Sequence, residues 1–187
     1  MGAVKTRLAG SIGDERALGV YEMLRQHTAN VTTGVQAVRV VAYSDFLPES
    51  DLFNPEKFSV RLQEGDDLGE RMYRAIAGGF AEGFSQVVLI GTDCLELTTG
   101  VIEAAFDALD HGDAVIGPAC DGGFYLIGLR RICRELFLNR VWSTATVYSE
   151  SVALLVQSGM SYASLPELSD IDTVEDLQRS ALWPLIP

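Results

Sequence analysis

Residues 86–94 read QVVLIGTDC, a short apolar run that ends in glycine, threonine and aspartate. The run has the length and composition of a strand buried on both faces of a sheet. Residues 113–118 (DAVIGP) and 124–129 (FYLIGL) have the same character, and the turn-forming stretch 119–123 (ACDGG) separates them. These three segments predict three strands.

Amphipathic segments alternate with the predicted strands. Apolar residues recur every four positions from Leu68 to Phe80, which predicts a helix. Similar stripes cover residues 17–31, 101–109 and 143–157. Further short strands are predicted at residues 37–43, 58–63 and 161–165, and a capping box at Thr173 and Asp176 opens a last helix. Strands that alternate with helices imply crossover connections, so we predict one α/β domain over residues 1–187, with a mostly parallel sheet flanked by helices.

The composition excludes several classes of protein. The chain has 187 residues, 48% of them hydrophobic, which excludes intrinsic disorder. A net charge of -12 argues against a general nucleic-acid binder, and no apolar run is long enough to span a membrane. Three cysteines at unrelated spacings suggest neither a disulfide framework nor a metal-binding pair. We therefore expect a soluble, cytoplasmic domain.

Carboxylates follow two predicted strands at the edge where ligands of α/β sheets usually bind. Asp93 comes directly after the most apolar strand, where it could hold a divalent cation or cap the next helix. Asp170 and Asp172 follow the last short strand and point the same way in an extended segment, so one of them could join Asp93 around a metal. Alternatively, Asp172 or Thr173 only caps the final helix.

Two glycine-containing segments could approach a ligand closely. Asp121 is followed by Gly122 and Gly123, which permit positive φ and close contact with a ligand, although a plain hairpin turn fits equally well. At the start of the chain, Lys5 and Arg7 suit a diphosphate, although they could also belong to a solvated end.

A third polar segment lies between the predicted strand 58–63 and the helix that follows. Gln63 could read the edge of a nucleobase and Arg71 could reach a phosphate. The acids beside them are also ordinary first-turn residues of a helix. His27 and His111 are predicted to be structural or solvent-facing.

Six motifs in order resemble a known family: G-x-V-K-T-R-L, Q-x-G-D-D-L-G-E-R-M, G-T-D-C, G-P-A-x-D-G-G-[FY]-Y-L-I-G, W-S-T and L-S-D-I-D-T-x-E-D-L. This is the DUF2064 family, which is glycosyltransferase-like and has the GT-A (nucleotide-diphospho-sugar transferase) fold. The family is similar to the 2-phospholactate and molybdenum-cofactor guanylyltransferases. The resemblance runs from Gly2 to about Leu182.

The resemblance implies a chemistry and a set of roles. Mg²⁺ or Mn²⁺ would bridge the phosphates of a nucleotide, held by Asp93 and by Asp172 or Asp170. Lys5 and Arg7 match the phosphate-binding segment. On the acceptor or sugar side, the matching residues are Asp121, Gly122, Gly123, Trp142 and Ser143.

The chain departs from the family pattern in two places. Family members usually read G-T-D-C-P-D-L, whereas Leu95-Glu96 stands here in place of Pro-Asp. Family chains also carry a strand and a P-x-P-G turn before K-T-R-L, whereas this chain starts at the glycine of that turn. The resemblance therefore implies an N-terminally truncated domain that lacks its first, central strand, or a substitute strand from elsewhere.

Three functions remain open on the sequence. The first is metal-dependent transfer of a sugar from a nucleotide-diphosphate donor to a small-molecule acceptor. The second is nucleotidyl transfer from a nucleoside triphosphate to a small phosphorylated acid. The third is a non-catalytic nucleotide-binding or interaction protein, suggested by the missing strand and the altered Leu95-Glu96 pair. A homodimer is a possible assembly.

Overall fold

The computed structural model describes residues 5–185, so Gly2 of the predicted phosphate-binding segment lies outside the described residues. The α-helices are α1 Thr6–Ile12, α2 Asp14–Thr33, α3 Leu68–Ala81, α4 Thr99–His111, α5 Val147–Gln157 and α6 Val174–Arg179. The strands are β1 Val40–Tyr43, β2 Ser59–Leu62, β3 Val87–Ile90, β4 Ala114–Pro118, β5 Phe124–Leu129 and β6 Tyr162–Ser164. Two 3₁₀ helices, η1 Arg134–Leu136 and η2 Trp183–Leu185, complete the order.

The larger sheet has the strand order β3-β5-β4-β6. Strand β5 is antiparallel to both of its neighbours, and β6 is parallel to β4. The predicted α/β class is confirmed, with β5 running against the other three strands. Residues 119–123 connect β4 to β5 and are too few for a crossover, so this pair forms a hairpin.

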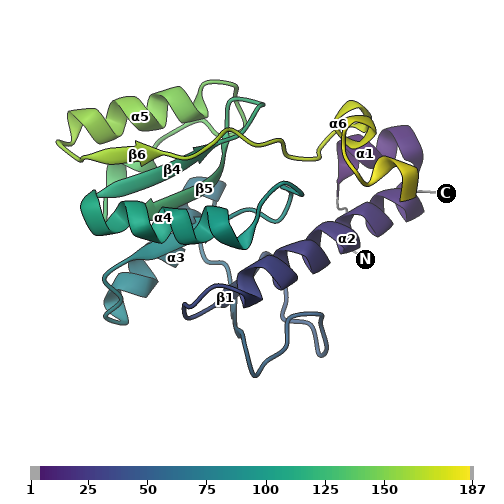
Figure 1. The fold of residues 1–187 in the computed structure, drawn as a ribbon, viewed down its shortest axis with the longest axis horizontal. Helices are drawn as coiled ribbons and strands as arrows, with labels where there is room; N and C mark the ends of the chain where they lie inside the picture. The colour runs from purple at the N-terminus through teal and green to yellow at the C-terminus, as the bar shows by residue number, and fades with distance from the viewer. Residues whose placement is uncertain (1–4, 186–187) are drawn as a thin grey trace.

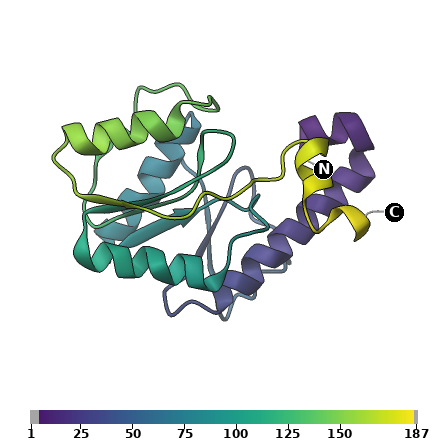
Figure 2. The same ribbon diagram turned by 45° about the horizontal axis from the view of Figure 1, so that its top comes forward.

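Helices cover both faces of this sheet (Figures 1 and 2). On one face, Ile102 and Leu109 of α4 pack against Leu126 of β5. On the other face, Ile76 of α3 and Leu155 of α5 pack against the opposite side of the same strands. The three layers bury β4 and nearly all of β5. Strand β3 lies at the edge of the sheet and is half-buried along its whole length, so the prediction that it is buried on both faces is wrong.

The smaller sheet contains β1 and β2, which are parallel. It packs beside α2 through a cluster that contains Ala29, Phe53 and Phe58. Within residues 5–185 no strand joins β1 to β3, so the two sheets are separate. Residues 5–185 therefore contain no strand in the place of the central strand that members of the resembled family carry.

Helices α1 and α6 lie together, away from the larger sheet (Figure 1). They share with α2 an apolar cluster of Leu8, Ala17, Val20, Leu24, Ile171, Leu177 and Leu182. The sequence analysis did not predict α1, in which Leu8 is the buried residue. It also began the fifth helix at Ser143, whereas α5 begins at Val147, because Ser143 has a positive φ of 61° that no right-handed helix contains. The capping box at Thr173 is confirmed.

No helix within residues 5–185 is both long and apolar enough to cross a membrane.

Candidate functional site

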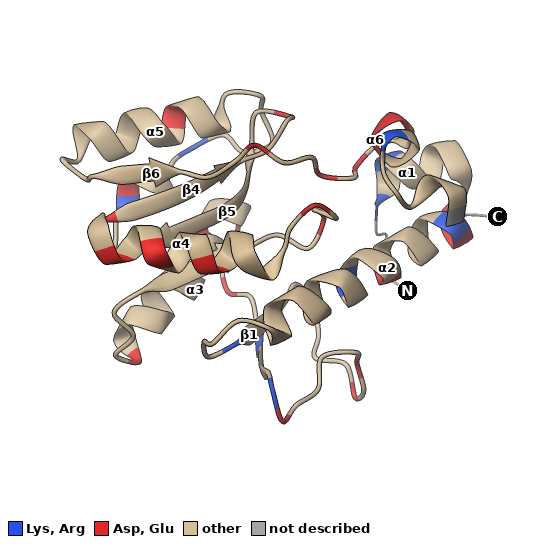
Figure 3. Ribbon diagram, viewed as in Figure 1, with Lys and Arg blue, Asp and Glu red and all other residues tan. Residues whose placement is uncertain are grey.

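Three separate segments meet at the ends of β3 and β4: the loop after β3, the turn after β4 and the segment that leads into α6. The backbone N–H of Ile171 donates to the carbonyl of Asp93 at 2.9 Å, which joins the first and third segments. Leu168 forms a parallel bridge with Ala119, which joins the third segment to the second. In Figure 3, acidic positions lie along the loop after β3 and along the segment before α6. These contacts define the strand-end site.

The ammonium group of Lys5 lies between two carboxylates of this site. Its Nζ is 2.9 Å from Oδ1 of Asp93 and 2.8 Å from Oδ1 of Asp172. Nζ donates one hydrogen bond to this Asp172 oxygen and another, of 2.6 Å, to the carbonyl oxygen of Ile171. The Lys5 side chain is only 5% exposed, and its backbone is left-handed at φ 50° and ψ 46°. The two acids that the sequence assigned to a metal therefore already share one cation.

Asp170 lies beside this pair and has an unusual protonation equilibrium. Burial, followed by the charges of Asp93, Asp121 and Asp172, raises the pKa of its carboxyl from the ordinary 3.8 to about 7, and Lys5 partly opposes this rise. A carboxyl with such a pKa is substantially protonated near neutral pH. Folding therefore brings more carboxylates together at this site than the single ammonium of Lys5 neutralises.

The raised pKa of Asp170 predicts a pH-dependent effect of Asp170→Asn. The folded state holds the proton of Asp170 more tightly than the unfolded state does. The contribution of this carboxyl to the free energy of unfolding is therefore complete below pH 4 and is lost as the pH rises through about 7. We expect Asp170→Asn to raise the free energy of unfolding at pH 8 by roughly 1 kcal/mol or more, at about 1.36 kcal/mol per pKa unit. At pH 4 the two proteins should be nearly equal. Urea denaturation of both proteins at the two pH values measures this difference.

Asp107→Asn removes one charge from an exposed position of α4 and is the matched control. It should leave the pH dependence of wild-type stability unchanged. An effect of Asp170→Asn that is the same at pH 4 and pH 8 would contradict the raised pKa.

Neighbouring polar residues hold the third segment in place. Oε2 of Glu96 accepts a hydrogen bond of 2.8 Å from the backbone N–H of Ser169. Asp176 accepts from the N–H of Thr173 at 2.9 Å, so it completes the cap of α6. Because Thr173 and Asp176 make the cap, the side chain of Asp172 is left to contact Lys5. The simple capping interpretation thus holds for Thr173, and Glu96 acts as an anchor in this structure.

The Asp121-Gly122-Gly123 turn packs tightly against the segment before α5. Oδ1 of Asp121 accepts from the N–H of Gly123 at 2.8 Å, and Asp121 is exposed. Gly122 has a φ of 88°, and a Cβ at this position would lie 2.6 Å from the carbonyl carbon of Ala145. The N–H of Tyr148 donates to the carbonyl of Gly122 at 2.8 Å. The turn is therefore both a hairpin turn and a close backbone contact with residues 145–148.

Trp142 joins two motifs that are distant in the sequence. Its ring packs edge-on to Phe124 with centroids 6.2 Å apart, and the guanidinium of Arg140 lies 5.0 Å from its ring centre. The indole Nε1 is buried without a hydrogen-bond partner within the described residues. A Cβ added at Gly69 of α3 would overlap this ring, so the Q-x-G-D-D-L-G-E-R-M and W-S-T motifs are in direct contact.

Gln63 and Arg71 contact each other and not the strand-end acids. Arg71 Nη1 donates to Oε1 of Gln63 at 3.5 Å, and its Nε donates to the carbonyl of Gly65 at 3.1 Å. Arg7 is exposed on α1, and no hydrogen bond or ion pair to another described residue involves it. The roles predicted for these three residues toward a nucleotide stay predictions.

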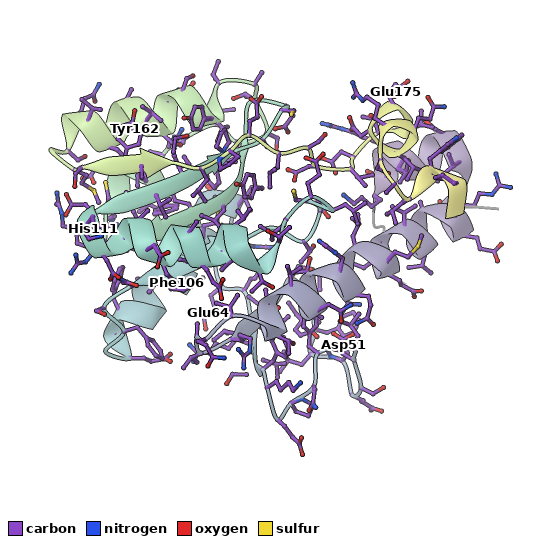
Figure 4. The ribbon with its side chains drawn as sticks, in the orientation of Figure 1. Asp51, Glu64, Phe106, His111, Tyr162 and Glu175 are labelled. Atoms are coloured by element: carbon purple, nitrogen blue, oxygen red, sulfur yellow. The ribbon has the colours of Figure 1, made fainter. Side chains whose placement is uncertain are left out.

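Both histidines lie where the sequence analysis expected. His27 Nε2 is 2.7 Å from the carbonyl oxygen of Leu97, which ties α2 to the loop after β3. His111 lies at the C-terminal end of α4 and, like Tyr162, on the side of the sheet away from α6 and its Glu175 (Figure 4).

Sequence reasoning missed one contributor, the carbonyl oxygen of Ile171. A backbone acceptor has no signature in the sequence. The only available signal was the apolar Ile171 between two aspartates, since its buried side chain anchors this segment in the α1–α2–α6 cluster.

The oxygen atoms of the strand-end site suit a hard divalent cation whose remaining ligands come from a substrate. Within residues 5–185 no group of three or more His, Cys, Asp or Glu is arranged to hold a metal by itself. Asp93 and Asp172 nevertheless both contact the ammonium of Lys5, which also contacts the carbonyl oxygen of Ile171. Mg²⁺ is commonly bound by one or two carboxylates together with substrate phosphates, so these residues fit it.

The fold is that of a nucleotide-diphospho-sugar transferase-like α/β protein. A crystal structure of a proposed nucleotide-diphospho-sugar transferase from Desulfovibrio desulfuricans G20 has a TM-score of 0.85 and 32% identity, covering 98% of this chain and 87% of that chain. The profile of a family described as uncharacterized proteins conserved in bacteria (DUF2064) matches residues 27–144. The chain belongs to this family.

Two more distant structures share the fold. CMP:2-keto-3-deoxy-manno-octonic acid synthetase, complexed with CTP, has a TM-score of 0.53 and 11% identity, covering 83% of this chain and 85% of that chain. The homolog of Mycobacterium tuberculosis rv0371c from Mycobacterium sp. strain JC1 has a TM-score of 0.50 and 14% identity, covering 83% of this chain and 80% of that chain. No curated protein matches the sequence.

Proposed function

We propose that the protein transfers a sugar from a nucleotide-diphosphate donor to a small-molecule acceptor, with Mg²⁺ or Mn²⁺ held by Asp93 and Asp172. The observation that carries the proposal is that both carboxylates, at the strand ends, contact the same positive group, the ammonium of Lys5. The 32% identical relative supports it, because its proposed activity belongs to the same class.

The residues of the site suggest a division of labour. Asp93 and Asp172 would hold the cation, which when bound would supply positive charge beside the leaving diphosphate. Asp121 is exposed, with one carboxylate oxygen bonded to Gly123, so the other can orient an acceptor hydroxyl and take its proton. The acceptor oxygen then forms a bond to the anomeric carbon. The bond from that carbon to the diphosphate oxygen breaks, and the diphosphate leaves with the electron pair.

Calorimetric titration of the protein with UDP, GDP and CDP, each with and without Mn²⁺, tests this proposal. We expect one nucleoside diphosphate to bind only when Mn²⁺ is present, and the matching nucleotide sugar to bind in the same way. CTP and GTP form the second arm, since the fold is shared with a synthetase complexed with CTP. Metal-dependent binding of a triphosphate alone would favour nucleotidyl transfer. The absence of metal-dependent binding for every nucleotide would reject both enzymatic functions.

A further inference from the structure

The ammonium group of Lys5 is enclosed by three oxygen atoms of the strand-end site. Nζ donates hydrogen bonds to Asp172 at 2.8 Å and to the carbonyl of Ile171 at 2.6 Å, and it forms an ion pair with Asp93 at 2.9 Å. The side chain of Lys5 is also only 5% exposed. In this arrangement Lys5 cannot donate to a diphosphate, which is the role that the sequence predicted for it.

The same two carboxylates cannot serve Lys5 and a divalent cation together. Metal–oxygen distances of about 2.0–2.6 Å would place a cation on Asp93 and Asp172 in close contact with the ammonium. Two positive charges a few ångströms apart in a partly buried site repel each other strongly. Lys5 contacts Oδ1 of both acids, so a divalent cation that binds these two atoms has to displace the ammonium.

We propose that Lys5 is an internal competitor of the divalent metal, and that metal binding releases its ammonium to contact the donor diphosphate. This inference rests on the proposed function, which supplies the metal and the nucleotide. It gives the site an order of binding, because the lysine becomes a phosphate ligand only after the metal has replaced it. Without metal, Lys5 neutralises Asp93 and Asp172 and leaves the phosphates without this ligand.

The chain contains an internal control for a labelling experiment on the wild-type protein. It has only two lysines, the buried Lys5 and the exposed Lys57 on the loop before β2. Acetylation by a water-soluble acetylating reagent, followed by mass spectrometry of the peptides, reports the reactivity of each lysine. We expect Lys5 to react slowly in EDTA and several-fold faster with Mn²⁺, whereas Lys57 reacts equally in both. Addition of the nucleotide found by calorimetry should slow Lys5 again.

Lys5→Met tests the competition directly, and Lys57→Met is the matched control that makes the same change at the exposed lysine before β2. Without nucleotide, Lys5→Met should bind Mn²⁺ about tenfold or more tightly than wild type, if the lysine leaves the acids less than about a tenth of the time. Lys57→Met should stay within about threefold of wild type, because an exposed charge is strongly screened. At saturating Mn²⁺, Lys5→Met should bind the nucleotide more weakly. A merely structural lysine would not produce opposite changes in metal and nucleotide affinity.

The outcomes separate this inference from the proposed function. If Mn²⁺ and nucleotide bind together but Lys5 stays protected, and Lys5→Met binds Mn²⁺ no more tightly than Lys57→Met, the competition is rejected while the transferase proposal stands. If no nucleotide binds in a metal-dependent way, the proposed function fails first. Should Lys5→Met not fold, the labelling of the wild-type protein decides the question alone.

Discussion

Asp93→Asn is expected to weaken Mn²⁺-dependent nucleotide binding about 100-fold or more, which corresponds to about 2.7 kcal/mol. The asparagine removes one of the two carboxylates that contact Lys5 and that are proposed to hold the metal, so Asp172 alone would remain. A neutral amide oxygen is a much weaker partner for a divalent cation than a carboxylate. Calorimetry of the variant with the nucleotide identified for the wild-type protein measures the loss.

The fold should tolerate this change. The link between the loop after β3 and the segment before α6 uses the backbone carbonyl of Asp93, which accepts from the N–H of Ile171. That bond does not depend on the side chain, and the carboxylate is partly exposed. We therefore expect a cooperative thermal transition for Asp93→Asn, so a binding defect can be assigned to the site.

Asp107→Asn is again the charge-matched control, because Asp107 is exposed on α4. It should bind the nucleotide as the wild-type protein does. Equal Mn²⁺ dependence in Asp93→Asn and Asp107→Asn would show that Asp93 is not a metal ligand, and the assignment of the strand-end site would then be wrong.

The sequence predicted the strands and the long helices well because their apolar patterns are strong. Residues 86–91 and 124–129 are short apolar runs whose ends are marked by glycine and aspartate. The second run is largely buried, whereas the first is half-buried because β3 is an edge strand. Helix α1 was missed because residues 6–12 are few, include Gly10 and have no apolar stripe. Its stability comes from packing of Leu8 with α2 and α6, which only the tertiary structure supplies.

The strand-end site was predictable as a set of acids and not as an arrangement. Asp93, Asp170 and Asp172 were recognisable because each follows a predicted strand. The partner of Asp172 is Lys5, 167 positions away in the sequence, and no local pattern links them. The sequence analysis therefore paired Lys5 with a phosphate by its residue type alone, whereas the folded chain pairs it with the acids.

The second large effect concerns stability, and Gly122→Ala should show it. Two costs add at this position. A non-glycine residue at φ 88° costs about 1–2 kcal/mol, and the new Cβ would overlap the backbone of Ala145, which costs roughly 1–3 kcal/mol more. We expect the free energy of unfolding to fall by about 2–5 kcal/mol in urea denaturation.

Gly83→Ala separates these two costs. Gly83 has a similar φ of 92°, but no atom lies within 4 Å of the position that a Cβ would occupy. This variant should therefore lose only the conformational part, about 1–2 kcal/mol. The difference between the two variants measures how tightly the Asp121-Gly122-Gly123 turn packs against residues 145–148.

That difference bears on function as well as on stability. The turn carries Asp121, and its carbonyl at Gly122 binds the N–H of Tyr148 at the start of α5. If Gly122→Ala costs 1 kcal/mol or more beyond Gly83→Ala, α5 fixes the backbone that presents Asp121 to the acceptor. Equal losses would mean that residues 145–148 move aside without cost, and Asp121 would then lack the fixed position that a proton acceptor in transfer chemistry requires.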